Sequence, residues 1–429
     1  MLQLLLRLIL LAALALAARA ADPSAVMNPL AETYVKLALA AGVHDGDYVD
    51  AYYGPAEWRT AAEAEKLPLA EVRTRLDVLG RDLAKVDTAG FDDLGRRRHA
   101  YLSKVVAALS TRLAIVAGGK FPFDDESLLI YDTVAPRQDA SHYEAVVAEL
   151  SKALPGEGPV AARYQAFRNQ FIIPSAKLDA VFQAAIAEAR ARTLKRIALP
   201  ADEKFTLEYV KNKPWGGYNW YQGNAHSVIQ INTDLPIFID RAVDLAAHEG
   251  YPGHHVYSTL LEQKLLKERG WVEFSVNPLF GPNAIIAEGS ANYGIEVAFP
   301  GAEKLTFERD VLFPLAGLDP AKAAEYARVQ ELTKKLSFAG NEAARRYLNG
   351  DITAPEAVAW LEKYALMEPA RAQQRVRFMD KYRSYVITYN HGLKLVSDSV
   401  EKQAKGDRDK RWEIFTELLS TPQLPSGLK

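Results

Sequence analysis

The proline–glycine pair at Pro252 and Gly253 constrains the fold of this chain more than any other short feature. It lies inside the stretch AAHEGYPGHHVY, residues 246–257. Apolar residues in and before this stretch predict a buried helix that enters it: Ile237, Val243, Leu245 and Ala246. Pro252 has no N–H to donate to the carbonyl of His248, and its ring clashes with that carbonyl. Because Gly253 also tolerates unusual backbone angles, we expect a kink or bulge after His248 instead of a straight helix.

The stretch begins like the zinc-protease motif H-E-x-x-H, with His248 and Glu249, but Pro252 takes the place of the second histidine. A neutral imidazole binds zinc, and the adjacent carboxylate can take a proton from a zinc-bound water. The remaining candidates for the second ligand are His254 and His255. In a straight helix His254 would point about 240° away from His248, and His255 would lie about 10 Å further along the axis. A break at the proline makes either histidine possible, and the spacing leaves both open.

A downstream segment, GPNAIIAEGSANYG at 281–294, offers a third ligand in Glu288. Asn283 is the expected N-cap of the helix that carries this glutamate. The small residues from Gly289 to Ala291 would let that helix lie close to the motif helix. Two histidines and a glutamate leave a fourth zinc position for water, and the same donors also suit other divalent ions. The alternatives are an interaction patch of histidines and a glutamate held in an ion pair.

Composition excludes several other classes of protein. The 429 residues contain no cysteine, which excludes disulfides, thiolate metal ligands and a lipid anchor on cysteine. Hydrophobic residues make up 49% and charged residues 25%, as in a globular protein. The formal net charge of −2 leaves no basic surplus, so we expect no nucleic-acid partner. Any transition-metal site must therefore use His, Asp and Glu.

Residues 1–20 resemble a secretory signal peptide. Arg7 precedes the short apolar run Leu8 to Ala18, and Ala18-Arg19-Ala20 forms an A-x-A cleavage site. We expect cleavage after Ala20, a periplasmic or secreted protein, and no membrane attachment afterwards. The alternative is an uncleaved anchor, although the run is short for a membrane span.

The rest of the chain is predicted to be mainly α, as one helical domain over residues 21–429 with an N-terminal lobe at about 21–200 and a catalytic lobe at about 201–429. Three-four apolar spacing predicts helices at 30–41, 69–86, 98–116, 321–348 and 355–364, and another that Ser175 would cap. The alternating run His226 to Asn232 predicts a strand in a small sheet just before the motif helix. Such a sheet could bind an extended peptide or be a structural hairpin only.

Four segments resemble the bacterial domain of unknown function 885 family, which is counted among the zincin-like metallopeptidases. They are HEGYPGHH at 248–255, EGSANY at 288–293, TYNHG at 388–392 and GGKFPFDDESLLIYDTVAP at 118–136. The resemblance spans most of the chain, and its P-G-H-H block is the specific part. The chain departs from the family at Ser290, where a tryptophan is usual, and at RSYVITY, where the family has Pro-Gly-Gln.

The resemblance implies a zincin-like, gluzincin-type helical fold with a small β-sheet beside the active-site helix. It implies His248, His254 and Glu288 as ligands of Zn²⁺, with His255 as the alternative ligand or a support for the ligands. Glu249 would be the general base and Tyr389 the group that stabilises the oxyanion of a tetrahedral intermediate. Two further side chains could take the place of Tyr389: Tyr293 and His391.

The expected function is a secreted zinc metallopeptidase that hydrolyses short peptides with a zinc-bound water and Glu249 as base. One alternative is a zinc amidohydrolase that acts on a non-peptide or cell-wall amide. The other is a non-catalytic binding protein on the same fold, which the intact Glu249 disfavours. Arg383, or a lysine near the cleft, is a candidate to hold a substrate C-terminus. The sequence does not choose between exopeptidase and endopeptidase, and it does not set the oligomeric state.

Overall fold

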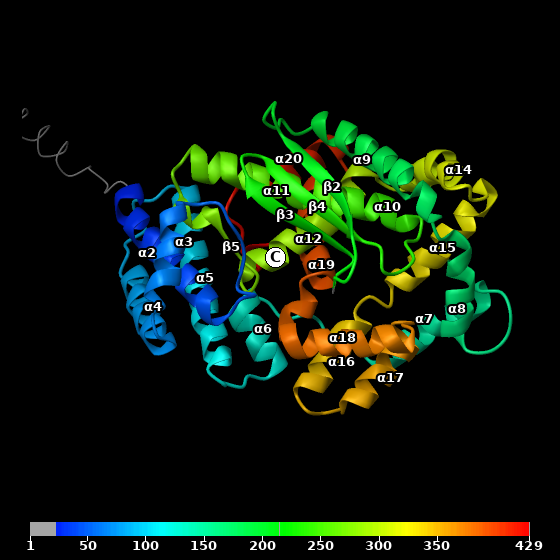
Figure 1. Ribbon diagram of the computed structural model, residues 1–429, viewed down its shortest axis with the longest axis horizontal. Coiled ribbons are helices and arrows are strands. Elements are labelled where there is room, and N and C mark those ends of the chain that lie inside the picture. The colour runs from blue at the N-terminus through cyan, green and yellow to red at the C-terminus, as the bar shows by residue number, and fades with distance from the viewer. Residues whose placement is uncertain (1–22, 214, 429) are drawn as a thin grey trace, which may run out of the picture.

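A computed structural model describes residues 23–213 and 215–428, so the predicted signal peptide at 1–20 lies outside the described residues. The chain is mainly helical and carries two small sheets, which confirms the mainly α part of the predicted fold class. Helices α2 to α6 gather at one end of the molecule in Figure 1, with the larger sheet near the middle. The bounds of the elements up to this sheet are α2 (Pro23–His44), β1 (Val49–Tyr52), α3 (Ala56–Glu65), α4 (Leu69–Ala84), α5 (Asp93–Val116), α6 (Phe123–Tyr131), α7 (Ala140–Ala153), α8 (Val160–Arg168) and α9 (Leu178–Leu194).

The second half of the chain holds the sheet, the motif helices and a group of C-terminal helices. The strands are β2 (Lys204–Val210), β3 (Gly217–Gly223), β4 (His226–Asn232) and β5 (Val276–Pro278). The helices are α10 (Asp240–Leu245), α11 (His254–Leu261), α12 (Pro282–Ala298), α13 (Ala302–Phe307), α14 (Phe313–Ala316), α15 (Ala323–Lys334), α16 (Ala339–Leu348), α17 (Ala354–Tyr364), α18 (Pro369–Tyr382), α19 (Asn390–Ala404) and α20 (Arg408–Ser420).

Most predicted helices coincide with observed ones, and two predictions are wrong in detail. The stretch 321–348 is divided into α15 and α16 by tight turns in which the amide of Leu336 donates to the carbonyl of Thr333. This break lets Leu336 pack into the core with only 3% of its surface exposed. Ser175 does not cap α9, because it lies in a turn closed by the amide of Lys177 on the carbonyl of Pro174.

The larger sheet has the strand order β2-β4-β3, with β4 parallel to β2 and antiparallel to β3. Strand β4 covers the predicted run His226 to Asn232 and buries alternate residues, which confirms the predicted strand. Its inner side chains Ile229 and Ile231 pack into the core that the motif helices share. Strand β3 is therefore an edge strand of this sheet, and its outer edge has no paired strand among residues 23–213 and 215–428.

Helix α12 lies between two hydrophobic cores. Ile285 packs into the core formed largely by α2 to α6, and its neighbour Ile286 packs into the core formed by the sheet and the motif helices. Both side chains are at most 1% exposed, and burying each contributes about 1.5–3 kcal/mol. A helix buried on nearly all sides holds its position firmly, so Glu288 is carried by one of the most constrained elements of the fold.

The smaller sheet pairs β1 with β5 in an antiparallel ladder. It brings Asp50, from the N-terminal part of the chain, beside Asn277, and the Nδ2 of Asn277 lies 3.4 Å from Oδ2 of Asp50. In the described part of the chain, no helix is both long enough and apolar enough to span a bilayer. The division into two lobes at residue 200 stays a prediction.

Candidate metal centre

The motif segment is broken after His248, as the Pro-Gly pair predicts. Helix α10 runs into a wide turn at Ala246–Gly250, and the chain leaves the helix before α11 begins at His254. In this turn the amide of Tyr251 donates to the carbonyl of Ala246, and the amide of Gly253 donates to that of Ala247. A Cβ at Gly253 would lie 1.9 Å from the carbonyl oxygen of His248, so only glycine fits this close approach.

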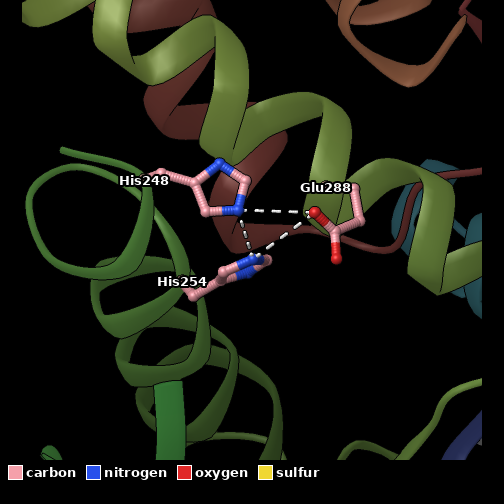
Figure 2. Close-up of side chains that lie close together, drawn as sticks. All are labelled: His248, His254 and Glu288. Atoms are coloured by element: carbon pink, nitrogen blue, oxygen red, sulfur yellow. Dashed lines mark hydrogen bonds and ion pairs between the residues drawn. The ribbon is translucent and has the colours of Figure 1, made fainter. Parts of the chain in front are cut away.

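The break brings His248 and His254 to face one another (Figure 2). Their Nε2 atoms are 3.2 Å apart, and the two rings meet nearly at right angles, at 87°. Glu288 projects toward both from α12, with Oε2 at 3.4 Å from His248 Nε2 and 3.8 Å from His254 Nε2. These three residues form a group whose ligand atoms all lie within 4.8 Å of one another. The structure thus brings together the three residues that the sequence predicts as ligands.

His255 lies on the other side of the turn and is fully buried. Its Nε2 donates to Oε2 of Glu203 at 3.0 Å, and its Nδ1 lies 2.8 Å from the hydroxyl of Ser227. Glu203 also accepts a hydrogen bond from the hydroxyl of Tyr251 at 2.6 Å and is paired with Arg190. Both ring nitrogens of His255 are therefore occupied, and it forms part of a closed hydrogen-bonded cluster.

Asn292 orients the ring of His248. The Oδ1 of Asn292 lies 3.2 Å from Nδ1 of His248, and its Nδ2 donates to the carbonyl of Glu288 one turn earlier at 2.9 Å. Since Nδ2 points at a carbonyl, Oδ1 is the acceptor that faces the histidine, and His248 carries its proton on Nδ1. The Nε2 lone pair is then directed at the group. A second partner that fixes the tautomer is typical of metal-binding histidines.

The group is surrounded by negative charge. Burial disfavours a charged His254, but the Glu288 carboxylate, with Glu249 and Asp50, raises its pKa to about 9. Burial opposes the charged form of Glu288, and the two histidines nevertheless hold its pKa well below the usual range. Burial raises the pKa of Asp50, and the other two carboxylates add to this. The three carboxylates together favour a cation at this position, which suits a bound metal ion.

One atom of the group lacks the partner that its burial requires. Oε2 of Glu288 is sealed from solvent and accepts no hydrogen bond of good geometry from the residues that the structure describes, although two histidine nitrogens lie near it. Buried polar atoms without partners are rare in folded proteins. Two histidine nitrogens and a carboxylate oxygen that face one another can bind a divalent ion, which would displace the proton of His254. The residues present therefore fit a metal, and the donor set does not select one ion.

Glu249 lies beside the group and against the sheet. The backbone of β3 approaches so closely that a Cβ at Gly217 would lie 3.0 Å from Oε1 of Glu249. The side-chain amide of Asn219, on the same strand, donates to the backbone carbonyl of Glu249 at 2.7 Å. Glu249 lines a cavity of about 850 Å³ together with the three residues of the group. Its carboxylate forms no hydrogen bond within the described ranges, so it is available to a molecule in the cavity.

Tyr389 also lines this cavity, with two tyrosines that sequence reasoning missed, Tyr385 and Tyr218. The hydroxyl of Tyr385 donates to Oε1 of Glu288 at 2.9 Å. Burial, followed by the charge of Glu288, raises the pKa of the Tyr389 phenol well above its usual range, so it stays protonated and can donate. Tyr385 precedes Tyr389 by about one helical turn in RSYVITY, a spacing that could have identified it.

Three other candidates point to different partners. The hydroxyl of Tyr293 donates to Glu401 at 2.5 Å, and Nε2 of His391 lies 3.0 Å from a threonine hydroxyl. Arg383 donates through Nε to Glu126 at 2.6 Å. None of the three lines the cavity with Glu249. Tyr293 and Arg383 thus have their partners elsewhere in the fold, and His391 is engaged through Nε2 only, its buried Nδ1 having no partner among the described residues.

Two expectations about α12 are wrong. The helix begins at Pro282 with Gly281 before it, so Asn283 is inside the first turn and does not cap it. The side chain of Asn283 donates instead to the carbonyl of Pro278 at 3.0 Å. Gly289 packs against the backbone of Gly392 in α19 and not against the motif segment. Gly289 thus serves a different helix pair from the one expected.

Comparisons with known proteins identify a similar fold for this chain but do not assign it to a family. No family model matches the chain, and none of the curated proteins matches it. A solved structure of a candidate lipoprotein from Colwellia psychrerythraea is similar over 87% of this chain and 71% of that one, with a TM-score of 0.54 and 16% identity. At this identity the match indicates a shared fold alone.

Two further solved structures are more distant. One is a candidate lipoprotein of unknown function from Shewanella oneidensis, with a TM-score of 0.43 and 14% identity over 86% of this chain and 74% of that one. The other is an M32 carboxypeptidase from Deinococcus radiodurans R1, with a TM-score of 0.39 and 14% identity over 92% and 90%. These two likenesses are too loose to transfer any property to this chain.

Proposed function

We propose that this chain is a zinc-dependent metallopeptidase of the gluzincin type that hydrolyses short peptides in the periplasm or outside the cell. The single observation that carries the proposal is the meeting of His248, His254 and Glu288 around the unpartnered Oε2 of Glu288. The resemblance of the HEGYPGHH and EGSANY segments to the zincin-like family supports the same assignment.

These three side chains would hold the metal ion, and a bound zinc ion supplies a Lewis acid that polarises a carbonyl and lowers the pKa of water. Asn292 keeps the Nε2 of His248 unprotonated by accepting from its Nδ1. Tyr385 holds the second oxygen of Glu288. Asn292 and Tyr385 therefore orient the donor atoms of His248 and Glu288 before a metal binds.

Glu249 acts as the general base. Its carboxylate lines the cavity with no hydrogen bond to another side chain in the described ranges, so it can take a proton from the attacking water and later give it to the leaving amine. The phenol of Tyr389 is the candidate donor to the oxygen that becomes negative when the carbonyl is attacked. Tyr218 lines the same cavity, but its hydroxyl is already donated to Asp50 at 2.7 Å.

Strand β3 provides a surface for the peptide. It forms one edge of the sheet, it lies against Glu249, and four of its residues line the cavity: Gly217, Tyr218, Asn219 and Tyr221. A peptide in extended conformation can add to such an edge through backbone hydrogen bonds. This placement favours a peptide over a compact small-molecule amide as substrate.

The proposal is tested by digesting a mixed peptide library with the zinc-loaded protein. Glu249→Gln should keep the metal and lose at least about a hundredfold in rate, the usual range for loss of a general base. The matched control is Glu325→Gln, the same change at an exposed residue of α15, which should keep full activity. If wild type cleaves no peptide, the peptidase assignment is wrong. The remaining functions are then hydrolysis of a non-peptide amide and non-catalytic binding. Equal rates for wild type and Glu249→Gln would refute the mechanism.

A further inference from the structure

One face of α18 forms a wall of the cavity. Arg375, Phe378 and Tyr382 recur at a three-four spacing, and all three line the cavity. The adjoining face is buried in the core: Ala372, Val376 and Met379. The helix thus presents an arginine to the cavity on a rigid element whose position the core fixes.

The guanidinium of Arg375 lies against aromatic rings and has no hydrogen-bond or ion-pair partner among the described residues. Its central carbon lies 4.7 Å from the ring centre of Phe378 and 5.9 Å from that of Tyr389. Its Nε is sealed from solvent and donates no hydrogen bond to any residue in the ranges 23–213 and 215–428. Burial lowers the pKa of Arg375, and the only neighbour that opposes this is Tyr389. An arginine has five N–H donors and stays charged in proteins, so leaving it unpaired is costly.

Other charged side chains of the cavity are already satisfied. Lys381 and Arg241 lie 3.0 and 3.7 Å from an aspartate oxygen. Asp50 has the hydroxyl of Tyr218 at 2.7 Å as a donor. A carboxylate that already accepts a hydrogen bond is a poor candidate to hold a substrate ammonium group. Beyond the metal group and Glu249, Arg375 is therefore the charged residue of the cavity that is ready to bind a ligand.

Aromatic side chains connect Arg375 to the metal group. The rings of Tyr389 and Tyr385 are 5.7 Å apart, and the hydroxyl of Tyr385 reaches Glu288 at 2.9 Å. Arg375 and Glu288 thus line one continuous cavity, with Tyr389 between them. A planar guanidinium matches the two oxygens of a carboxylate, and an aromatic surround strengthens such a charged contact by excluding water.

We propose that Arg375 is the carboxylate-binding residue of the substrate cavity. The proposal rests on the peptidase function above and adds to it that the substrate presents a carboxylate. That carboxylate is either the C-terminal group of the peptide, which makes the enzyme a carboxypeptidase, or the side chain of an aspartate or glutamate. Arg375 takes the role that the sequence suggested for Arg383, whose guanidinium is paired with Glu126.

The test measures binding without turnover. In the zinc-loaded Glu249→Gln protein, calorimetry compares a neutral peptide with a free C-terminus, the same peptide as its C-terminal amide, and an amide that carries one glutamate. We expect the free acid, the glutamate amide or both to bind at least about tenfold tighter than the neutral amide, the effect of one charge-assisted contact. Adding Arg375→Gln should weaken the preferred peptide at least about thirtyfold and remove the preference. The preferred peptide identifies the source of the carboxylate.

The control is Arg377→Gln, at an exposed arginine two residues away on the same helix, which should leave all affinities unchanged. Arg375→Gln should also keep or raise the melting temperature, because it removes an unpaired charge, whereas loss of a purely structural arginine would lower it. Arg375→Lys retains the charge without the planar fork, and it should keep part of the preference.

Equal affinity for the neutral amide and both carboxylate peptides would overturn the proposal, and so would a preference that survives Arg375→Gln. These results are separate from the fate of the peptidase assignment. If wild type cleaves acids and amides alike, the peptidase stands and the subsite falls. If wild type cleaves nothing while carboxylates bind through Arg375, the peptidase falls and the subsite stands.

Discussion

His254 and His255 are neighbours in the chain, and each faces a glutamate, yet their surroundings differ in kind. His255 is fully buried, and Glu203 and Ser227 occupy both of its ring nitrogens. His254 keeps 21% of its side chain exposed and faces Glu288, whose Oε2 accepts no hydrogen bond of good geometry. One cluster is complete, and the other lacks a partner for its buried oxygen.

The difference separates a structural role from a functional one. A buried polar cluster with every bond made fixes the fold, here by holding the turn at Tyr251 to the segment before β2. A cluster whose metal-donor atoms face one point without a bound partner persists only because the surrounding structure holds it. Such a cluster is where a ligand binds. We therefore expect changes in the Glu203 cluster to affect stability, and changes in the Glu288 cluster to affect metal binding.

The largest expected effect is on stability. Glu203→Ala removes the shared acceptor of His255, Tyr251 and Arg190, so it should lower the free energy of unfolding by about 3–5 kcal/mol, as for other broken buried ion pairs. Urea unfolding followed by circular dichroism measures this. Glu208→Ala, at an exposed glutamate of β2, should change stability by less than about 0.5 kcal/mol. Similar losses in both variants would mean that the Glu203 cluster is not a structural centre.

The second effect is metal-dependent stability. Zinc at a hundred times its dissociation constant should raise the free energy of unfolding of wild type by about 2.7 kcal/mol, because it binds only the folded chain. Removing the metal with a chelator should reverse the rise. His254→Ala should show no such rise, since it removes one of the three donors. A rise of the same size in His254→Ala would show that the ion binds elsewhere.

The third effect concerns the residue that orients His248. Asn292→Ala should weaken metal binding by about ten- to a hundredfold, or about 1.4–2.7 kcal/mol, because Nδ1 of His248 loses its acceptor. Competition with a coloured chelator measures the affinity. Asn169→Ala, at an exposed asparagine, serves as the control and should bind metal like wild type. Unchanged metal affinity in Asn292→Ala would contradict the claim that Asn292 prepares His248 for the metal by fixing its tautomer.

The smallest effect is a pH dependence. Burial alone would raise the pKa of Glu203, but hydrogen bonds from His255, Tyr251 and Arg190 lower it to about 2. A lowered carboxyl pKa stabilises the fold above the unfolded-state pKa and is lost as the pH falls through the folded-state value. The stability difference between wild type and Glu203→Gln should therefore be constant above about pH 5 and shrink between pH 5 and 2. A difference that grows on acidification would contradict the assigned pKa.

Local features of the sequence predicted local structure well. The Pro-Gly pair predicts the break after His248 because proline lacks the N–H that a helix needs at that position. Alternation predicts β4 because side chains of a strand face opposite sides in turn. The three predicted ligands lie together because the wide turn shortens the path between two histidines six residues apart.

Features that depend on distant segments were missed or misplaced. Asp50 reaches the cavity from the N-terminal part of the chain through the β1–β5 ladder, which no periodicity indicates. Arg375 and Arg383 look alike in sequence, and only packing pairs one of them with Glu126 and leaves the other free. Ser175 failed as a cap because the carbonyl of the preceding proline closes a turn first.

The most direct test of the central claim is the metal content of two full-length variants, His254→Ala and His255→Gln, dialysed against the same zinc buffer. The account predicts that His254→Ala keeps its helical circular dichroism and loses the bound zinc. It predicts that His255→Gln keeps one zinc per chain, even where its unfolding midpoint falls. Zinc retained by His254→Ala and lost by folded His255→Gln would contradict it.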